Sequence, residues 1–158
     1  MKLFTGSATT TASALSLANA ARDTGRAMSQ QNVEIVRGFY EAFARGDLES
    51  ALSAFDPEIV AYDHDIPDPG EYRGLEGLFR WQADWESSWE SWRWEPEEFI
   101  EAGDCVVAVL GVHAKGRGSG VDVERVDGAV WTFRDGKCIR LDYYGSKAEA
   151  LEAVGLRE

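Results

Sequence analysis

Ala129-Val-Trp-Thr-Phe-Arg-Asp-Gly-Lys-Cys-Ile-Arg-Leu-Asp-Tyr-Tyr144 carries the clearest structural signal in the chain. The residues on either side of its centre are rich in β-branched and aromatic side chains, which favour extended strands. Asp135-Gly136 lies between these two runs, and a tight primed turn needs the positive φ that glycine adopts without strain. The segment therefore predicts a β-hairpin that turns at residues 134–137.

An amphipathic helix is predicted upstream, from about Ser29 to Gly46. Its apolar side chains recur at helical spacing and so lie on one face: Val33, Val36, Phe39, Tyr40 and Phe43. Gly46 supplies the left-handed residue that often ends a helix. Asp47 then caps a short second helix, because its side chain can accept hydrogen bonds from the first free N–H groups.

A third helix is predicted from Gly74 to about Trp92. Trp81, Trp85 and Trp89 are four residues apart, so they stack on one helical face. Such a stripe is typical of a helix that packs on a sheet, and it also suits an aromatic wall beside a ligand. Both interpretations stay open from the sequence.

The rest of the chain is predicted to be mostly extended. A strand at 59–62 leads into a loop at 63–73, which holds prolines and a glycine. Further strands are predicted at residues 99–100, 106–114, 121–133 and 138–144, before a last helix at 147–154. This order of elements predicts an α+β fold: a curved antiparallel sheet wrapped around three N-terminal helices, with a short C-terminal helix. A strongly bent sheet encloses a cone, which gives a small domain room for a deep pocket.

Two of these features together resemble the NTF2-like superfamily. They are the hairpin and the helix that ends in Phe39-Tyr-Glu-Ala-Phe-Ala-Arg-Gly-Asp-Leu48. Within that superfamily the chain is similar to SnoaL-like proteins of the polyketide-cyclase type and to ketosteroid-isomerase-like proteins. The resemblance implies an NTF2-like cone over residues 28–158, a pocket for a small hydrophobic molecule, no cofactor, and a homodimer.

The acidic composition excludes several classes of partner. The 158 residues have a formal net charge of -12, and both nucleic acids and anionic membrane surfaces repel such a protein. No apolar run reaches the length that a membrane span needs, so we expect a soluble protein. Cys105 and Cys138 match no metal spacing, and whether they form a disulfide depends on whether their strands are neighbours.

Residues 1–27 differ from everything after them. They are rich in Ala, Thr and Ser and show no sustained period, and Met28-Ser-Gln-Gln31 has the character of a natural start. We therefore predict a disordered N-terminal extension at 1–27 and a cytoplasmic domain at 28–158. Secretion is the alternative, because Lys2 and the small residues Ala18-Asn-Ala20 faintly follow the order of a signal peptide.

The resemblance to ketosteroid isomerase extends to single residues. It aligns the general-base aspartate of that enzyme with Asp63, directly after the strand at 59–62. A carboxylate at a pocket rim can remove a proton from carbon next to a carbonyl. The same alignment puts Phe39 and Ala129 where the enzyme has its two oxyanion donors, and losing one such donor costs about two orders of magnitude in rate or more. We therefore expect no literal steroid isomerase activity, while Asp63 remains the candidate general base.

A second resemblance is to limonene-epoxide-hydrolase-type enzymes, which activate water with one arginine and two aspartates. Arg125-Val-Asp127 and Asp142 echo that set. If Leu141 and Tyr143 point into the fold, as the apolar alternation indicates, Asp142 points outward. Asp127 is an even number of residues before Ala129, Trp131 and Phe133, so it is expected on the same face of the strand as they are. It is therefore the better candidate of the two aspartates. An ion pair of Arg125 with Asp127 on the outside of the sheet is the alternative.

His64 and His113 are the only histidines, and we predict no metal site, because such a site needs two or three converging ligands. A hydrogen-bonded histidine at the edge of a cavity is the simpler interpretation of His113. If it lay beside Asp63, the two would form an acid–base pair. Asp63 has a plain alternative as well, since acidic residues often solvate and cap loops such as 63–73.

Two classes of function follow. As an enzyme, the protein is an isomerase or cyclase that acts on a hydrophobic carbonyl compound, with Asp63 moving the proton. As a binding module, it is a non-catalytic ligand-binding or dimerisation domain of the same superfamily. In both cases four aromatic side chains are expected to shape the cavity: Tyr40, Trp81, Trp131 and Tyr143.

Overall fold

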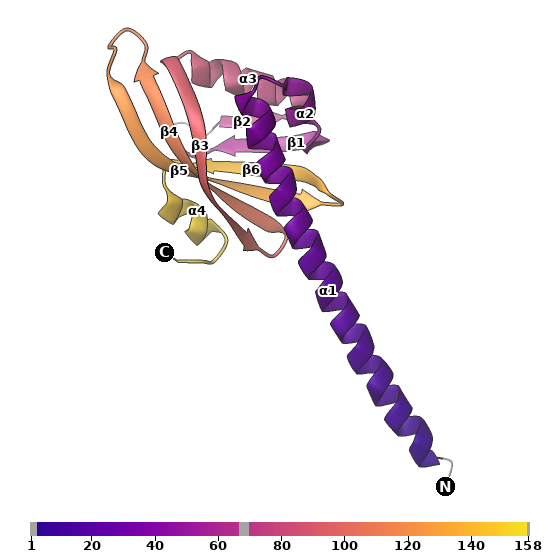
Figure 1. The fold of residues 1–158 in the computed structure, drawn as a ribbon. Helices are drawn as coiled ribbons and strands as arrows, with labels where there is room; N and C mark the ends of the chain where they lie inside the picture. The colour runs from indigo at the N-terminus through magenta and orange to yellow at the C-terminus, as the bar shows by residue number, and fades with distance from the viewer. Residues whose placement is uncertain (1–2, 67–69, 158) are drawn as a thin grey trace.

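Six strands form one curved sheet in the part of the chain that the computed structural model describes, residues 3–66 and 70–157 (Figure 1). The strands are β1 (Phe55–Asp63), β2 (Gly70–Arg73), β3 (Trp89–Ala102), β4 (Cys105–Gly116), β5 (Asp122–Arg134) and β6 (Lys137–Tyr144). Their order across the sheet is β2-β1-β6-β5-β4-β3. Neighbouring strands are antiparallel, except that β1 and β6 run parallel.

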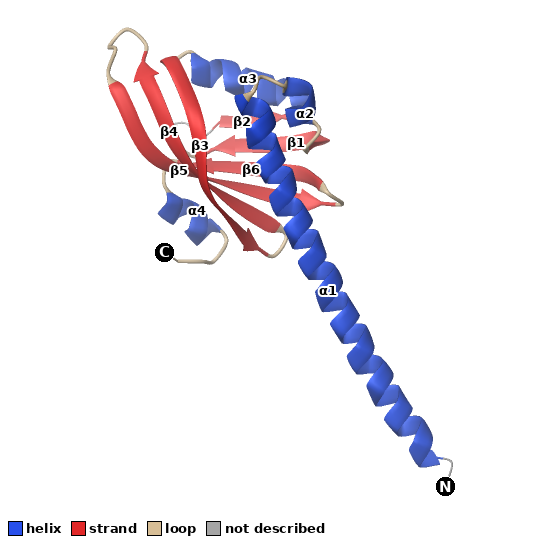
Figure 2. Ribbon diagram, viewed as in Figure 1, coloured by secondary structure: helices blue, strands red, loops and turns tan. Residues whose placement is uncertain are grey.

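Helices cover both faces of this sheet (Figure 2). They are α1 (Leu3–Ala44), α2 (Leu48–Leu52), α3 (Gly74–Glu86) and α4 (Lys147–Ala153). α1 and α3 pack on the concave face, while α4 packs on the outer face against Val107, Val109 and Val130. The predicted α+β class and its curved sheet are confirmed. None of the helices in the described residues is long and apolar enough to cross a membrane.

The N-terminal part of α1 projects away from the sheet (Figure 1). Its helical backbone runs through residues 3–27, where the sequence predicts a disordered extension. Side chains between residues 16 and 27 are exposed, and Leu17 is 72% exposed. This part of the helix therefore buries little against the domain, and burial begins only at Asn32. The domain boundary near residue 28 stays a prediction.

The hairpin between β5 and β6 is confirmed. Arg134 pairs with Lys137, and the two residues between them both have positive φ, 53° at Asp135 and 76° at Gly136. These angles make a tight primed turn whose twist matches that of the flanking strands. The pairing that follows from it places Ala129 opposite Tyr143 in the middle of the sheet.

The third helix is shorter than predicted. α3 ends at Glu86, so Trp89 and Trp92 belong to β3 instead. A stripe at every fourth residue fits a strand of period two as well as a helix, and pairing with β4 decides in favour of the strand. The predicted loop at 63–73 also contains a strand, because Gly70–Arg73 pairs with the end of β1.

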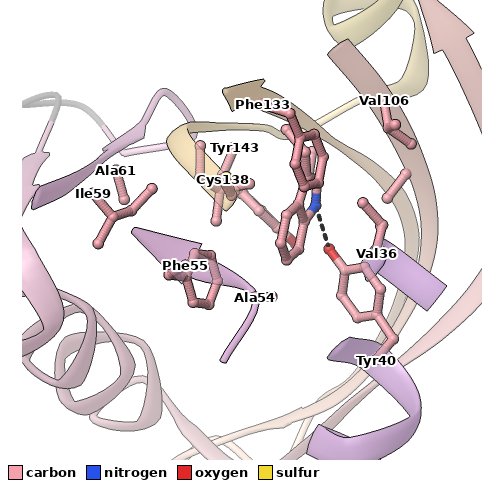
Figure 3. Packing of buried hydrophobic residues seen from close by; sticks show 14 of the residues in the cluster. Val36, Tyr40, Ala54, Phe55, Ile59, Ala61, Val106, Phe133, Cys138 and Tyr143 are labelled. Carbon is pink, nitrogen blue, oxygen red and sulfur yellow. Dashed lines mark hydrogen bonds between the residues drawn. The ribbon is translucent and has the colours of Figure 1, made fainter. Parts of the chain in front are cut away.

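The main core lies between α1, α3 and the concave face of the sheet (Figure 3). Trp131 is fully buried there and donates its indole N–H to the hydroxyl of Tyr40 over 3.2 Å. Burial raises the pKa of the Tyr40 phenol, which therefore stays neutral. Cys105 and Cys138 are free thiols, so the disulfide alternative is not realised.

Candidate functional site

An apolar cavity lies between the first three helices and the concave face of the sheet. Its volume is about 70 Å³, and its walls include Tyr40, Trp81, Trp85, Trp94, Leu141 and Tyr143. Leu48 and Phe79 also line it and are 41% and 47% exposed, so they mark its mouth. Because a single water occupies roughly 10–15 Å³ by such a measure, the cavity as it stands holds only a few groups of that size. A larger ligand must displace aromatic side chains.

A second hollow, of about 260 Å³, adjoins this cavity, and charged side chains stand among the aromatic ones that line it, so we call it the polar hollow. Trp81 and Trp85 line both spaces, so the two rings of α3 form the partition between them. The polar hollow is also lined by Asp63, Asp65, Asp84, Arg125 and Tyr72. An apolar space and a charged space therefore meet at one pair of tryptophans.

Asp63 stands at the end of β1 and is only 2% exposed. Its Oδ2 accepts a hydrogen bond from Trp81 Nε1 over 2.9 Å, and its Oδ1 accepts one from the backbone N–H of Asp65, also over 2.9 Å. Hydrogen bonds to a carboxylate are stronger than those between neutral groups. Two donors therefore fix the orientation of this carboxylate beside the tryptophan partition.

Arg125 joins two further carboxylates on the concave side. It forms an ion pair with Asp65, and its Nε lies 2.9 Å from Oδ1 of Asp127, which is fully buried. Asp127 also accepts a hydrogen bond from the hydroxyl of Tyr143, and Trp94 Nε1 donates to that hydroxyl over 3.2 Å. A continuous polar chain thus runs from the acidic hollow to the wall of the apolar cavity.

Burial shifts the pKa values of the side chains in this hydrogen-bonded series. It raises the pKa of Asp127 above its ordinary value, although the Tyr143 hydroxyl and Arg125 oppose the shift. Burial and the nearby Asp127 charge raise the pKa of Tyr143 well above its usual range. Burial alone would lower the pKa of Arg125, but Asp127 and Asp65 outweigh it and raise that pKa. Arg125 is therefore a fixed positive charge and Tyr143 a neutral hydroxyl.

The four aromatic residues predicted to shape the cavity have different positions. Tyr40, Trp81 and Tyr143 line the apolar cavity. Trp131 lies behind Tyr40 in the core and is not part of the cavity wall. Asp63 faces the polar hollow instead, held by the N–H of Trp81.

His113 lies apart from Asp63. It has the strand parity of Val107 and Val109, which pack under α4 on the outer face. Its ring nitrogens meet Glu95 over 2.9 Å and Glu124 over 3.4 Å. The acid–base pair of His113 with Asp63 is therefore not formed. Within the described ranges, no group of three or more His, Cys, Asp and Glu side chains is placed to hold a metal ion.

Strand parity in β6 is as predicted. Leu141 and Tyr143 line the apolar cavity, and Asp142 points to the other face. There Asp142 binds His64 Nε2 over 2.8 Å and Arg140 Nε over 2.8 Å. Asp142 thus cannot join Arg125 in the hydrolase-like set, whereas Arg125 and Asp127 do lie together on the concave side.

The sequence interpretation gave no role to Asp65, although the alternation Asp63-His-Asp65 already places two carboxylates on the same side of an extended chain. It named Trp85 only as part of the period-four stripe that suits an aromatic wall, and the structure places its ring in the lining of both hollows. The contact of Asp65 with Arg125 had no local signal, because 60 residues separate them.

Comparison with known proteins agrees with this fold. A family model described as the SnoaL-like domain matches residues 36–141. That range covers the end of α1 and most of the sheet. No curated protein matches the chain at a significant level.

Solved structures share the fold. TerC co-crystallised with polyporic acid is 25% identical, with a TM-score of 0.66 over 78% of this chain and 98% of that one. A putative SnoaL-like polyketide cyclase from Jannaschia is 21% identical, with a TM-score of 0.63 over 73% and 85%. A hypothetical protein with a ketosteroid isomerase-like fold from Catenulispora acidiphila, in complex with trimethylamine, is 20% identical, with a TM-score of 0.62 over 78% and 93%.

Proposed function

The chain belongs to the SnoaL-like domain family, and we propose that it binds a small hydrophobic carbonyl compound and moves a proton on it, as an isomerase or cyclase does. The observation that carries this proposal is the position of Asp63. Its carboxylate is almost fully buried, is held by two donors, and lines the polar hollow beside the aromatic partition. A general base needs such a fixed position, because proton transfer requires contact with the reacting carbon.

The proposed reaction begins when Asp63 removes a proton from the carbon next to the carbonyl. The electrons of the broken C–H bond move into the carbonyl group, giving an enolate. Returning the proton from Asp63 to another carbon of a conjugated enolate completes an isomerisation. Attack of the enolate carbon on a second carbonyl closes a ring, and the alkoxide formed takes the proton back from Asp63. Arg125 lines the same hollow, and its fixed positive charge offsets part of the repulsion that the neighbouring carboxylates exert on the enolate.

The aromatic walls serve the apolar part of the ligand. Trp81 and Tyr143 meet edge to face, with ring centroids 5.8 Å apart, and Trp85 meets Tyr143 in the same way at 5.6 Å. Such rings bury apolar surface and exclude water, which strengthens the electrostatic contacts of the neighbouring carboxylate. Solved neighbours with names of the polyketide-cyclase and ketosteroid-isomerase type support this chemistry as a family tendency.

The test is titration followed by turnover. Small hydrophobic carbonyl compounds, beginning with 1-indanone, are titrated while tryptophan fluorescence is recorded, and exchange of the α-protons for deuterium is followed by NMR. We expect saturable binding and catalysed exchange that the Asp63→Asn variant loses while its affinity is retained. Binding without exchange, unaffected by Asp63→Asn, would instead identify a non-catalytic binding module.

A second candidate function is hydration of an epoxide, because one arginine does bridge two aspartates, Asp65 and Asp127. The raised pKa of Asp127 suits an acid that protonates the epoxide oxygen, while Asp65 would activate water. Styrene oxide in ¹⁸O-labelled water tests this: labelled diol that disappears with Asp127→Asn supports it. No diol formation at all would remove it.

We also propose a homodimer built on the outer face of the sheet. α4 covers that face over Val107, Val109 and Val130, and it leaves the part around His113 uncovered. Sedimentation at several concentrations tests this proposal, and a monomer at every concentration would contradict it.

A further inference from the structure

Three buried polar side-chain atoms of the described residues lack a hydrogen-bond partner, and they lie together. They are Nε1 of Trp85, Nε of Arg125 and Oδ1 of Asp127. The guanidinium of Arg125 stands over the Trp85 ring, 5.8 Å from its centroid, and also contacts Asp127. A buried polar group without a partner is costly, so native proteins keep few of them. Two of them, Arg125 Nε and Asp127 Oδ1, face each other, so the unmet N–H of Trp85 is the one that points to a ligand.

The three atoms differ in what they lack. Arg125 Nε and Asp127 Oδ1 are 2.9 Å apart, so their charges compensate each other although the N–H is poorly aligned. Trp85 Nε1 has no acceptor in the described part of the chain. An indole N–H can only donate, so the missing partner must be an acceptor atom.

Trp85 also stands where a ligand must pass. It lines both the apolar cavity and the polar hollow, and its ring packs edge to face on Tyr143. The apolar cavity of about 70 Å³ is too small for a whole ring system with its substituents. A ligand that extends from this cavity toward Asp63 therefore displaces the partition and brings its polar group to Trp85.

Charge restricts the identity of that acceptor. Three carboxylates line the polar hollow, from Asp63, Asp65 and Asp84, against the single guanidinium of Arg125. A carboxylate or phosphate group on the ligand would meet repulsion from these acids. An uncharged oxygen would not.

We infer that Trp85 donates its indole N–H to the uncharged carbonyl oxygen of the ligand at the junction of the two hollows. This inference rests on the proposed function and names the recognition element of the same site. It assigns to Trp85 the hydrogen bond that no side chain at Phe39 or Ala129 can make. The ligand class is thus a neutral ketone or aldehyde on an apolar frame.

The test compares two probes that differ in one carbonyl group, 1-indanone and indane. Their dissociation constants are measured by titration calorimetry for the wild type, Trp85→Phe and Trp92→Phe. Trp92 lines the apolar cavity too, so Trp92→Phe is the matched control for a lost indole. We expect the wild type and Trp92→Phe to prefer the ketone, and Trp85→Phe to lose roughly five- to tenfold of that preference, which is the worth of one hydrogen bond.

An NMR measurement on the wild type removes any dependence on how the variants fold. The chain has six tryptophans, so its ¹H–¹⁵N spectrum contains six indole N–H signals, and Trp85→Phe assigns one of them. We expect 1-indanone to shift the indole N–H signal of Trp85 downfield, because the ketone oxygen accepts its hydrogen bond. Indane has no acceptor atom, so we expect no such downfield shift with it.

The outcomes separate this inference from the proposed function. Equal preference for the ketone in wild type and Trp85→Phe, or an unmoved Trp85 signal in a saturated complex, overturns the role of Trp85 alone. Failure of both probes to bind overturns the proposed pocket function and this inference together. Tighter binding of indane-1-carboxylate than of 1-indanone also overturns the inference, because it shows an anion site.

Discussion

The two faces of the sheet use the same kinds of charged side chain in different ways. Asp63 and His64 are adjacent in sequence, yet Asp63 binds Trp81 on the concave side while His64 binds Asp142 on the outer side. The outer carboxylate is fully matched, because Arg140 adds two contacts to Asp142, over 2.8 and 3.1 Å. A closed set of partners of this kind stabilises the fold and leaves nothing to offer a ligand.

The concave side is different in two respects. Its carboxylates line a hollow, and the buried polar atoms of Trp85, Arg125 and Asp127 that lack a partner all lie there. Incomplete satisfaction is costly in a buried place and is found chiefly where function requires it. Whether the buried polar atoms have all their hydrogen-bond partners, more than the presence of charge, therefore distinguishes the candidate site from the ion pairs of the outer face.

The largest expected effect pairs Asp63→Asn with Asp142→Asn. Both changes replace a buried aspartate by an isosteric amide, one on each face. Asp63→Asn is expected to slow deuterium exchange into 1-indanone about a hundredfold to ten-thousandfold, the usual contribution of a general base. Asp142→Asn is expected to leave the exchange rate unchanged. Equal losses in the two variants would remove the distinction between the faces.

The next effect is on stability and compares Arg125→Leu with Arg140→Leu. Arg125→Leu leaves Asp65 and buried Asp127 without their cation, so we expect the free energy of unfolding to fall by about 3 kcal/mol. The Arg140 side chain is 53% exposed, and Asp142 keeps His64, so Arg140→Leu is expected to cost less than about 1 kcal/mol. Urea denaturation followed by tryptophan fluorescence measures both. A larger loss of stability for Arg140→Leu than for Arg125→Leu would contradict this order of the two ion pairs.

The smallest effect concerns pH. Burial raises the pKa of Asp127 in the folded chain above its ordinary value of 3.8. Between pH 3.8 and the raised pKa, Asp127 holds a proton in the folded chain that it has released in the unfolded chain. The free energy of unfolding therefore falls as pH rises through this range. Asp127→Asn is expected to remove this fall. Urea midpoints of wild type and variant from about pH 4 upward measure it, and parallel curves would show that Asp127 has no raised pKa.

Local signals predicted a large part of the fold. The turn at Asp135-Gly136 followed from backbone chemistry, and the alternation around Leu141 and Tyr143 gave the correct faces of β6. These features depend on neighbours in sequence, for which spacing is a direct guide. The same signals misassigned Trp89, because a period of four residues suits both a helix and a strand until the partner strand is known, and Trp92 was carried into the helix with it.

The site was predictable only in part. Asp63 was singled out by the resemblance to ketosteroid isomerase and Asp127 by its strand parity, and both side chains are buried on the concave side. Their arrangement was not, because the contact of Asp65 with Arg125 depends on how β1, β6 and β5 align. Strand register and the parallel pairing of β1 with β6 are set by the whole sheet. The unpartnered N–H of Trp85 likewise exists only in the packed molecule.

A crystal structure of the protein with 1-indanone tests the central claim most directly, that the concave side of the sheet holds the reacting compound. We predict that the ring system extends from the apolar cavity past the displaced tryptophan partition, with the ketone oxygen within hydrogen-bond distance of Trp85 Nε1 and the α-carbon facing the carboxylate of Asp63. A ketone bound on the outer face near His64, or inside the cavity with its α-carbon remote from Asp63, would contradict it.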